Sequence, residues 1–162
     1  MRIWYFSVLW TVFFDCVAWF AIHMGVSYIM TQMRLEYFNS QSWAFLRRGW
    51  ENDGRIYQDI FSVKKWKGLL PEGAALFAQG FRKKHLKGKN KDYVSMFVAE
   101  TCRSEGVHWV TMIFAPFFFL WNPLWVGVVM IGYAVAANLP CIITQRYNRI
   151  RLERMLHRRI EH

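Results

Sequence analysis

The stretch ETCRSEGVHW, residues 100–109, places two carboxylates, an arginine and a histidine directly before an almost wholly apolar run. This run extends from Trp109 to Thr144 and is interrupted only by Trp121-Asn122-Pro123. A second long apolar run covers residues 3–33 near the beginning of the chain. The function of the ionisable groups at the start of the later run decides whether the chain is an enzyme or only an anchor.

Charge and hydrophobicity are segregated along the 162 residues. The chain is 54% hydrophobic and 19% aromatic, yet it has a formal net charge of +10. This combination is expected if the apolar residues lie in lipid and the basic residues lie at its surface. A helix needs roughly 20 residues to cross a bilayer, so the runs predict spans at about 3–33, 107–121 and 123–144. The predicted fold is an all-α integral membrane protein, a single domain over 1–162 with about three transmembrane helices and a turn at Asn122-Pro123.

Lysine and arginine predict the orientation of these spans. They are concentrated in segment 34–106 and in the tail 145–162, whereas the turn at Asn122 carries no charge. The positive-inside rule places both basic segments in the cytosol, as in a multi-pass protein of the bacterial cell membrane. The basic run 81–92 is expected to be a loop attracted to anionic lipid. The length of the first apolar run and its Asp15 favour an uncleaved anchor over a signal peptide.

The segment RIYQDIFSVKKWKGLLPEGA, residues 55–74, has apolar residues close to helical spacing and lysines beside them. This pattern predicts a basic amphipathic helix lying on the membrane surface, as part of a set of interfacial helices in the cytosolic segment. The alternative is that Lys65, Trp66 and Lys67 belong to a site for a phosphate-bearing substrate. The sequence leaves both interpretations open.

On a helix, Glu100, Thr101, Glu105 and His108 share one face within an arc of roughly 140°. The three-residue spacing brings Glu105 within reach of His108. Histidine is well suited to accept a proton near neutral pH, and ionisable groups beside a membrane span are functional by default. We therefore take His108 as a candidate base, oriented by Glu105 or Glu100 while the other carboxylate pairs with Arg103. The alternative is that these charges only pair and extend toward the headgroups.

The end of the last predicted span repeats this arrangement. Asn138, Gln145 and Arg149 fall within roughly 40° of one another on a helix and form a polar stripe leading to the cytosol. Arg146 and Arg149 lie where phosphates would be met, and arginine suits bidentate phosphate contact. We expect these residues and Asn148 to bind substrate, with an ordinary basic anchor as the alternative.

His23 in the first span lies eight residues after Asp15, just over two helical turns. The two side chains therefore share a face that points away from lipid. They are expected either to pair or to line a pocket for the substrate that accepts the transferred group.

No metal or cofactor is expected. The three cysteines form no C-x-x-C pair and predict neither a disulfide framework nor a zinc site. A single Glu-x-x-His lacks the second copy that a di-iron site in a helix bundle requires. Nucleic-acid binding is also rejected, because the basic residues flank apolar spans and no nucleic-acid motif is present.

Three strings in this order, KKWKGLLPEGA, ETCRSEGVHW and NLPCIITQRYNR, resemble the glycosyl-4,4'-diaponeurosporenoate acyltransferase family of staphyloxanthin-type carotenoid synthesis. The resemblance covers about residues 55–152 and implies that a fatty acyl group is esterified to a sugar hydroxyl of a glycosylated carotenoid. The motif positions carried over to this chain are Glu100, Arg103, Glu105, His108, Trp109, Asn138, Gln145, Arg146, Asn148 and Arg149.

A membrane O-acyltransferase is the function we expect, acting on a glycolipid in the membrane with an acyl thioester, acyl-CoA or acyl carrier protein, as donor. His108 would remove the hydroxyl proton, and Asn138, Gln145 or an arginine would donate to the oxyanion. Arg146, Arg149, Lys65 and Lys67 would meet the donor's phosphates or an acidic carrier. The alternatives are a non-catalytic subunit that binds lipid or pigment, and another small membrane group-transfer enzyme such as a methyltransferase.

Overall fold

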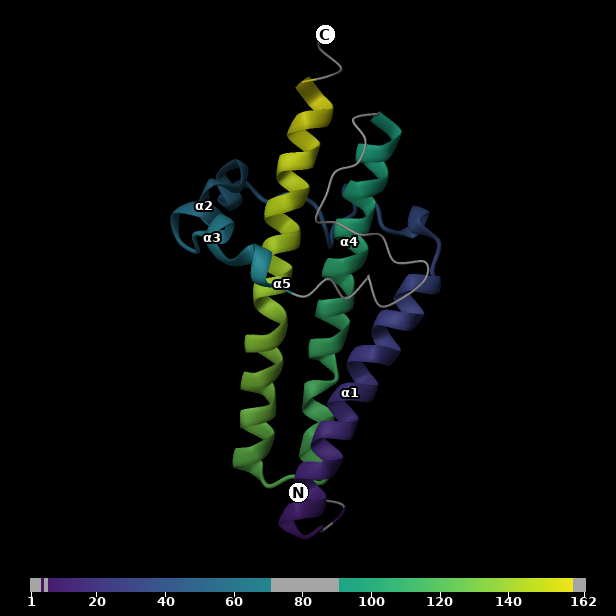
Figure 1. Ribbon diagram of the computed structural model, residues 1–162, viewed down its shortest axis with the longest axis vertical. Helices are drawn as coiled ribbons and strands as arrows, with labels where there is room; N and C mark the ends of the chain where they lie inside the picture. The colour runs from purple at the N-terminus through teal and green to yellow at the C-terminus, as the bar shows by residue number, and fades with distance from the viewer. Residues whose placement is uncertain (1–3, 5, 71–90, 159–162) are drawn as a thin grey trace.

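The computed structural model describes residues 4, 6–70 and 91–158, and the regular structure of these residues is entirely helical. The predicted all-α class is therefore confirmed. Three long helices, α1 (Val8–Gln32), α4 (Lys91–Ile113) and α5 (Leu124–Arg158), run along the long axis of the molecule (Figure 1). The short helices are η1 (Leu35–Tyr37), η2 (Gly49–Gly54), α2 (Arg55–Asp59), α3 (Val63–Trp66), η3 (Lys67–Leu69) and η5 (Ala115–Leu120). Residues 81–90 of the predicted basic loop lie outside the described residues.

Two helices, α1 and α5, are long and apolar enough to cross a membrane by length and composition. The middle span predicted at 107–121 stays a prediction, and its residues belong to two elements of the structure. Residues 107–113 complete α4, a helix that begins at Lys91 and includes the charged motif, and the 3-10 helix η5 then follows with Pro116 at its start. Proline suits the first turn of a helix because its missing N–H is not needed there.

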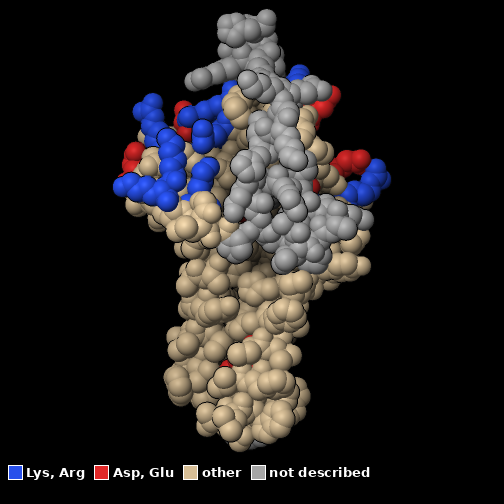
Figure 2. Space-filling view, in the orientation of Figure 1, with Lys and Arg blue, Asp and Glu red and all other residues tan. Residues whose placement is uncertain are grey.

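Charged side chains gather at one end of the molecule. Figure 2 shows lysine and arginine over the half that contains α2, α3 and the end of α5, whereas the surface of the other half is almost without charge. This division agrees with an apolar half in lipid and a basic half at the membrane surface.

The apolar residues of segment 55–70 pack against α5. Tyr57 and Val63 form a buried cluster with Ile143, Tyr147 and Ile150. The prediction of one continuous amphipathic helix was wrong, because the segment is divided into α2, α3 and η3. The break falls where Ser62 adopts a left-handed backbone conformation with φ 49°, which no α-helix tolerates. Its apolar spacing therefore serves packing on α5.

Asp15 fastens α1 to the turn between η5 and α5. Its side chain is buried, and Oδ1 accepts hydrogen bonds from Trp121 Nε1 at 2.8 Å and Asn122 Nδ2 at 2.7 Å. One helical turn further along α1, Trp19 stacks on Phe118 of η5 with ring centroids 4.5 Å apart. Asp15 thus bonds to the turn and not to His23, and this contact fixes α1 against the rest of the bundle.

Replacing Asp15 by alanine removes the acceptor of two donors at the closed end of the bundle. We expect Asp15→Ala to lower the free energy of unfolding by about 2 kcal/mol, because a buried donor without an acceptor keeps its desolvation penalty with no hydrogen bond to offset it. The measurement is unfolding of the protein in detergent, followed by circular dichroism. Asp15→Asn retains one acceptor oxygen and should lose less. Equal stability of all three proteins would contradict this role of Asp15.

Candidate active site

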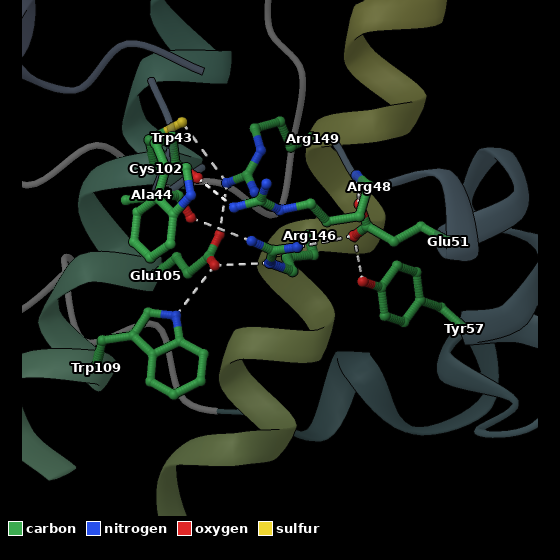
Figure 3. A network of polar contacts seen from close by, with 10 residues as sticks. All are labelled: Trp43, Ala44, Arg48, Glu51, Tyr57, Cys102, Glu105, Trp109, Arg146 and Arg149. Carbon is green, nitrogen blue, oxygen red and sulfur yellow. Dashed lines mark hydrogen bonds and ion pairs between the residues drawn. The ribbon is translucent and has the colours of Figure 1, made fainter. Parts of the chain in front are cut away.

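A fully buried carboxylate lies at the centre of the polar half. Glu105 Oε1 accepts hydrogen bonds from Arg146 Nε at 2.7 Å and Trp109 Nε1 at 3.1 Å (Figure 3). Its Oε2 lies 2.6 Å from a guanidinium nitrogen of Arg149. Spacing explains the arrangement: Arg146 and Arg149 are three residues apart on α5 and reach the same acidic side chain on α4. Without such partners the buried charge would be strongly unfavourable.

The network continues from Arg146 into the segment after α1. Arg146 places one terminal nitrogen 3.0 Å from Glu51 Oε1, and the other donates to the carbonyl of Ala44 at 3.2 Å. Glu51 is itself buried, and it accepts hydrogen bonds from the Tyr57 hydroxyl and from the backbone N–H of Arg48. Burial and the neighbouring Glu51 carboxylate raise the pKa of Tyr57 well above its ordinary value. The phenol therefore stays protonated and can donate to Glu51.

Glu51 was missed by the sequence analysis, and its contact explains why. It lies in η2, a short irregular element that includes left-handed residues at Asn52 and Asp53. Its partner Arg146 is 95 residues further along the chain. No periodic pattern marks such a position, so only the tertiary contact identifies it.

Cys102 lies against the second arginine. Arg149 donates to its sulfur at 3.6 Å and lies over the ring of Phe45, 5.7 Å from its centroid. Burial raises the pKa of the Cys102 thiol to about 11. The thiol is therefore protonated at neutral pH, which makes it a poor nucleophile.

The second carboxylate of the motif serves another interface. Glu100 accepts from Arg103 at 2.6 Å, so of the two carboxylates left open by the sequence it is Glu100 that pairs with this arginine. Arg103 also donates to the backbone carbonyl of Thr31 at 3.2 Å and so joins α4 to the end of α1. Thr101 is fully buried, and its hydroxyl donates to the Val98 carbonyl within its own helix.

His108 is held by an amide. Its Nδ1 lies 2.9 Å from Asn138 Oδ1, and Asn138 Nδ2 donates to the carbonyl of Ala134 at 2.8 Å. Since the amide nitrogen is committed to a carbonyl, Oδ1 is an acceptor and Nδ1 carries the proton. Nε2 of the neutral ring is then the basic nitrogen. The contact that orients His108 was expected from Glu105 or Glu100 and comes from Asn138 instead. The oxyanion role considered for Asn138 does not fit, because its amide N–H already donates to the Ala134 carbonyl.

Lys67 faces α5. Its ammonium donates to Asn148 Oδ1 at 2.9 Å and lies 5.3 Å from the centroid of the Tyr147 ring. Burial lowers the pKa of Lys67, and the nearby positive charges of Arg151 and Lys64 add to this effect. Lys67 of η3 and Asn148 of α5, two of the predicted substrate-binding residues, are therefore in direct contact.

The other predicted site residues lie apart from this contact. Lys65 is exposed, while Trp66 donates from Nε1 to the Phe61 carbonyl at 2.7 Å. Gln145 Oε1 and His23 Nε2 are both buried without a hydrogen-bond partner in the described part of the chain. Among residues 4, 6–70 and 91–158, no three His, Cys, Asp or Glu side chains are grouped to hold a metal ion.

Comparison with known proteins identifies the family. A model of the glycosyl-4,4'-diaponeurosporenoate acyltransferase family matches residues 41–158. Proteins of that name from Staphylococcus aureus strains bovine RF122 / ET3-1 and USA300 are each 32% identical over 146 residues, covering 90% of this chain and 88% of the relative. No solved structure matches the chain.

The chain therefore belongs to the glycosyl-4,4'-diaponeurosporenoate acyltransferase family, as the three sequence strings indicated. It is an acyltransferase, so the choice between enzyme and anchor is answered in favour of the enzyme. The matched region contains Glu51, Glu105, His108, Asn138 and Arg146, which together form the candidate active site and the network that supports it.

Glu51 should contribute strongly to stability. We expect Glu51→Gln to lower the free energy of unfolding by about 3 kcal/mol, because a buried ion pair loses one charge. Denaturation of the detergent-solubilised protein measures the change. Glu36→Gln is the matched control, since the Glu36–Arg34 pair is exposed and should contribute less than about 1 kcal/mol. Equal effects of the two substitutions would contradict the assignment of Glu51 to the network.

Proposed function

We propose that the protein is an integral membrane O-acyltransferase that moves a fatty acyl group from a thioester to a sugar hydroxyl of a membrane glycolipid. The family name suggests a glycosylated carotenoid as the acceptor. The observation that carries the proposal is the contact of His108 Nδ1 with Asn138 Oδ1, because it makes Nε2 the basic nitrogen of the ring.

The reaction needs one base and no covalent enzyme intermediate. Nε2 of His108 takes the proton of the sugar hydroxyl as the oxygen attacks the thioester carbonyl. The carbon–oxygen bond forms, the carbon–sulfur bond breaks, and the proton passes to the leaving thiolate. Direct transfer fits the buried, protonated Cys102 thiol, which offers no ready nucleophile.

The donor's anionic part is assigned to exposed basic side chains. Arg146 and Arg149 are both committed to buried carboxylates, so a phosphate would have to displace Glu105 or Glu51 from them. Lys64 and Lys65 are exposed residues of α3, a helix that lies at the charged end of the molecule. They suit the phosphates of acyl-CoA or the acidic surface of an acyl carrier protein.

The reaction would take place at the cytosolic rim of a bacterial cell membrane. In this proposal α1 and α5 each cross the bilayer, and the end of α4 with η5 supplies a third, shorter pass to the turn at Asn122. The separation of charged and uncharged halves in Figure 2 supports this orientation. His108 then lies three residues further along α4 than Glu105, toward the apolar half, where a lipid acceptor and a soluble donor can meet.

Removal of the imidazole tests the proposal. We expect His108→Ala to lower kcat at least about 100-fold, because the base in the transition state is lost. Thiol release is measured with purified protein, a glycosylated carotenoid and an acyl-CoA in mixed micelles, and circular dichroism verifies folding. His157→Ala is the control, since His157 is exposed near the end of α5 and its replacement should leave kcat unchanged. Unchanged kcat in folded His108→Ala would refute His108 as the base.

A further inference from the structure

Thr111 has a buried hydroxyl that finds no hydrogen-bond partner among the residues that the structure describes. The residue has no exposed surface, and its Oγ1 makes no hydrogen bond within the described part of the chain. Threonines in helices commonly bond to a carbonyl one turn earlier, as Thr31 does to Ser27 at 2.7 Å. A buried hydroxyl that makes no such bond lowers the stability of the fold, so its presence calls for an explanation such as a function.

The hydroxyl lies beside the proposed base. Thr111 is three residues after His108 on α4, so the two side chains occupy adjacent turns, with Cβ atoms roughly 5–6 Å apart. Towards the turn, the stacked rings of Trp19 and Phe118 close the space between α1 and η5. Apolar packing therefore closes the end of the bundle toward which Thr111 lies.

A second unpartnered atom lies at the same level on α1. The contact between Arg103 and the Thr31 carbonyl aligns the antiparallel helices α1 and α4. His23 lies eight residues before Thr31 on α1, and Thr111 lies eight residues after Arg103 on α4. Both helices rise about 1.5 Å per residue, so the two side chains reach the same height. His23 Nε2 is buried and, like Thr111 Oγ1, makes no hydrogen bond within residues 4, 6–70 and 91–158.

Two kinds of group first considered as oxyanion donors, the Asn138 amide and the arginines, are committed elsewhere. The amide nitrogen of Asn138 donates to the Ala134 carbonyl, and Arg146 and Arg149 are held by Glu105. The tetrahedral intermediate of acyl transfer still requires a donor aimed at its oxygen. A buried hydroxyl one turn from the base meets that requirement.

We propose that Thr111 Oγ1–H donates to the carbonyl oxygen of the acyl donor, and that His23, protonated on Nε2, supplies a second donor from α1. The inference rests on the proposed function. When the sugar oxygen attacks, the carbonyl π electrons move to this oxygen, and the two hydrogen bonds stabilise the negative charge. When the carbonyl re-forms, the carbon–sulfur bond breaks, and neither Thr111 nor His23 transfers a proton.

The position also indicates where the acyl chain lies. Thr111 has no exposed surface, so in this proposal an acyl carbonyl reaches it only when the side chains around it move apart. The rest of the chain would then extend along the apolar half, where most side chains of α1 are exposed to lipid. The acyl group would thus be bound inside the bilayer, while its thioester sulfur faces His108.

Thr111→Val tests the inference because it removes the hydroxyl and keeps the shape. We expect kcat to fall about 100-fold, as for loss of one oxyanion donor, with a small change in KM. The melting temperature should stay the same or rise, because the substitution removes an unsatisfied buried polar group. Thr111→Ser should retain most of kcat. The matched control is Thr31→Val, whose hydroxyl is satisfied within α1, and it should leave kcat unchanged.

Normal kcat in Thr111→Val would overturn the inference, and it would leave the proposed function intact if His108→Ala is inactive. Normal kcat in His108→Ala would instead refute the proposed function. If Thr111→Val does not fold, the comparison of Thr111→Ala with Thr111→Ser decides. A much lower kcat for alanine supports the hydroxyl, whereas equal values for the two variants overturn it.

Discussion

The Glu105 carboxylate has no contact with solvent, and its two arginine partners set the position of α5 on α4. A buried charge of this kind is tolerated only when opposite charges compensate it, so the helices cannot slide without separating Glu105 from Arg146 and Arg149. The same register brings His108, three residues after Glu105, opposite Asn138. The charges of the network thus fix the two helices, and the uncharged Asn138 amide orients the proposed base.

The network also separates two environments. Through Arg146 it reaches Glu51 and holds the segment after α1 against the polar end of α5. On the other side of it the molecule is apolar, closed at its far end by the bonds of Asp15 to the turn. The proposed acyl transfer to a lipid-embedded sugar, with His108 as its base, would take place at this boundary, where a soluble donor can meet a product that remains in lipid.

Much of α4 could be predicted because its features are local. Helical spacing limited the partner of Arg103 to Glu100 or Glu105, and it put Asn138 and Arg149 on one stripe of α5, where the structure has them facing α4. The partner of Glu105 could not be predicted, because it is chosen by packing between helices far apart in the sequence. The prediction of one continuous helix over segment 55–70 failed for a related reason. Its apolar spacing suits a helix, but contacts with α5 and the left-handed Ser62 divide it. The family strings identified the activity, whereas the arrangement of the site required the fold.

A double-mutant cycle between Glu105 and Arg149 tests the central claim most directly. Glu105→Gln, Arg149→Met and the double variant are unfolded in detergent, and the coupling free energy is calculated from the three changes. A buried pair that sets the helix register should couple by about 2 kcal/mol or more, with the double variant more stable than the sum of the single changes predicts. Additive changes, within about 0.5 kcal/mol, would contradict the claim, because the two side chains would then act independently.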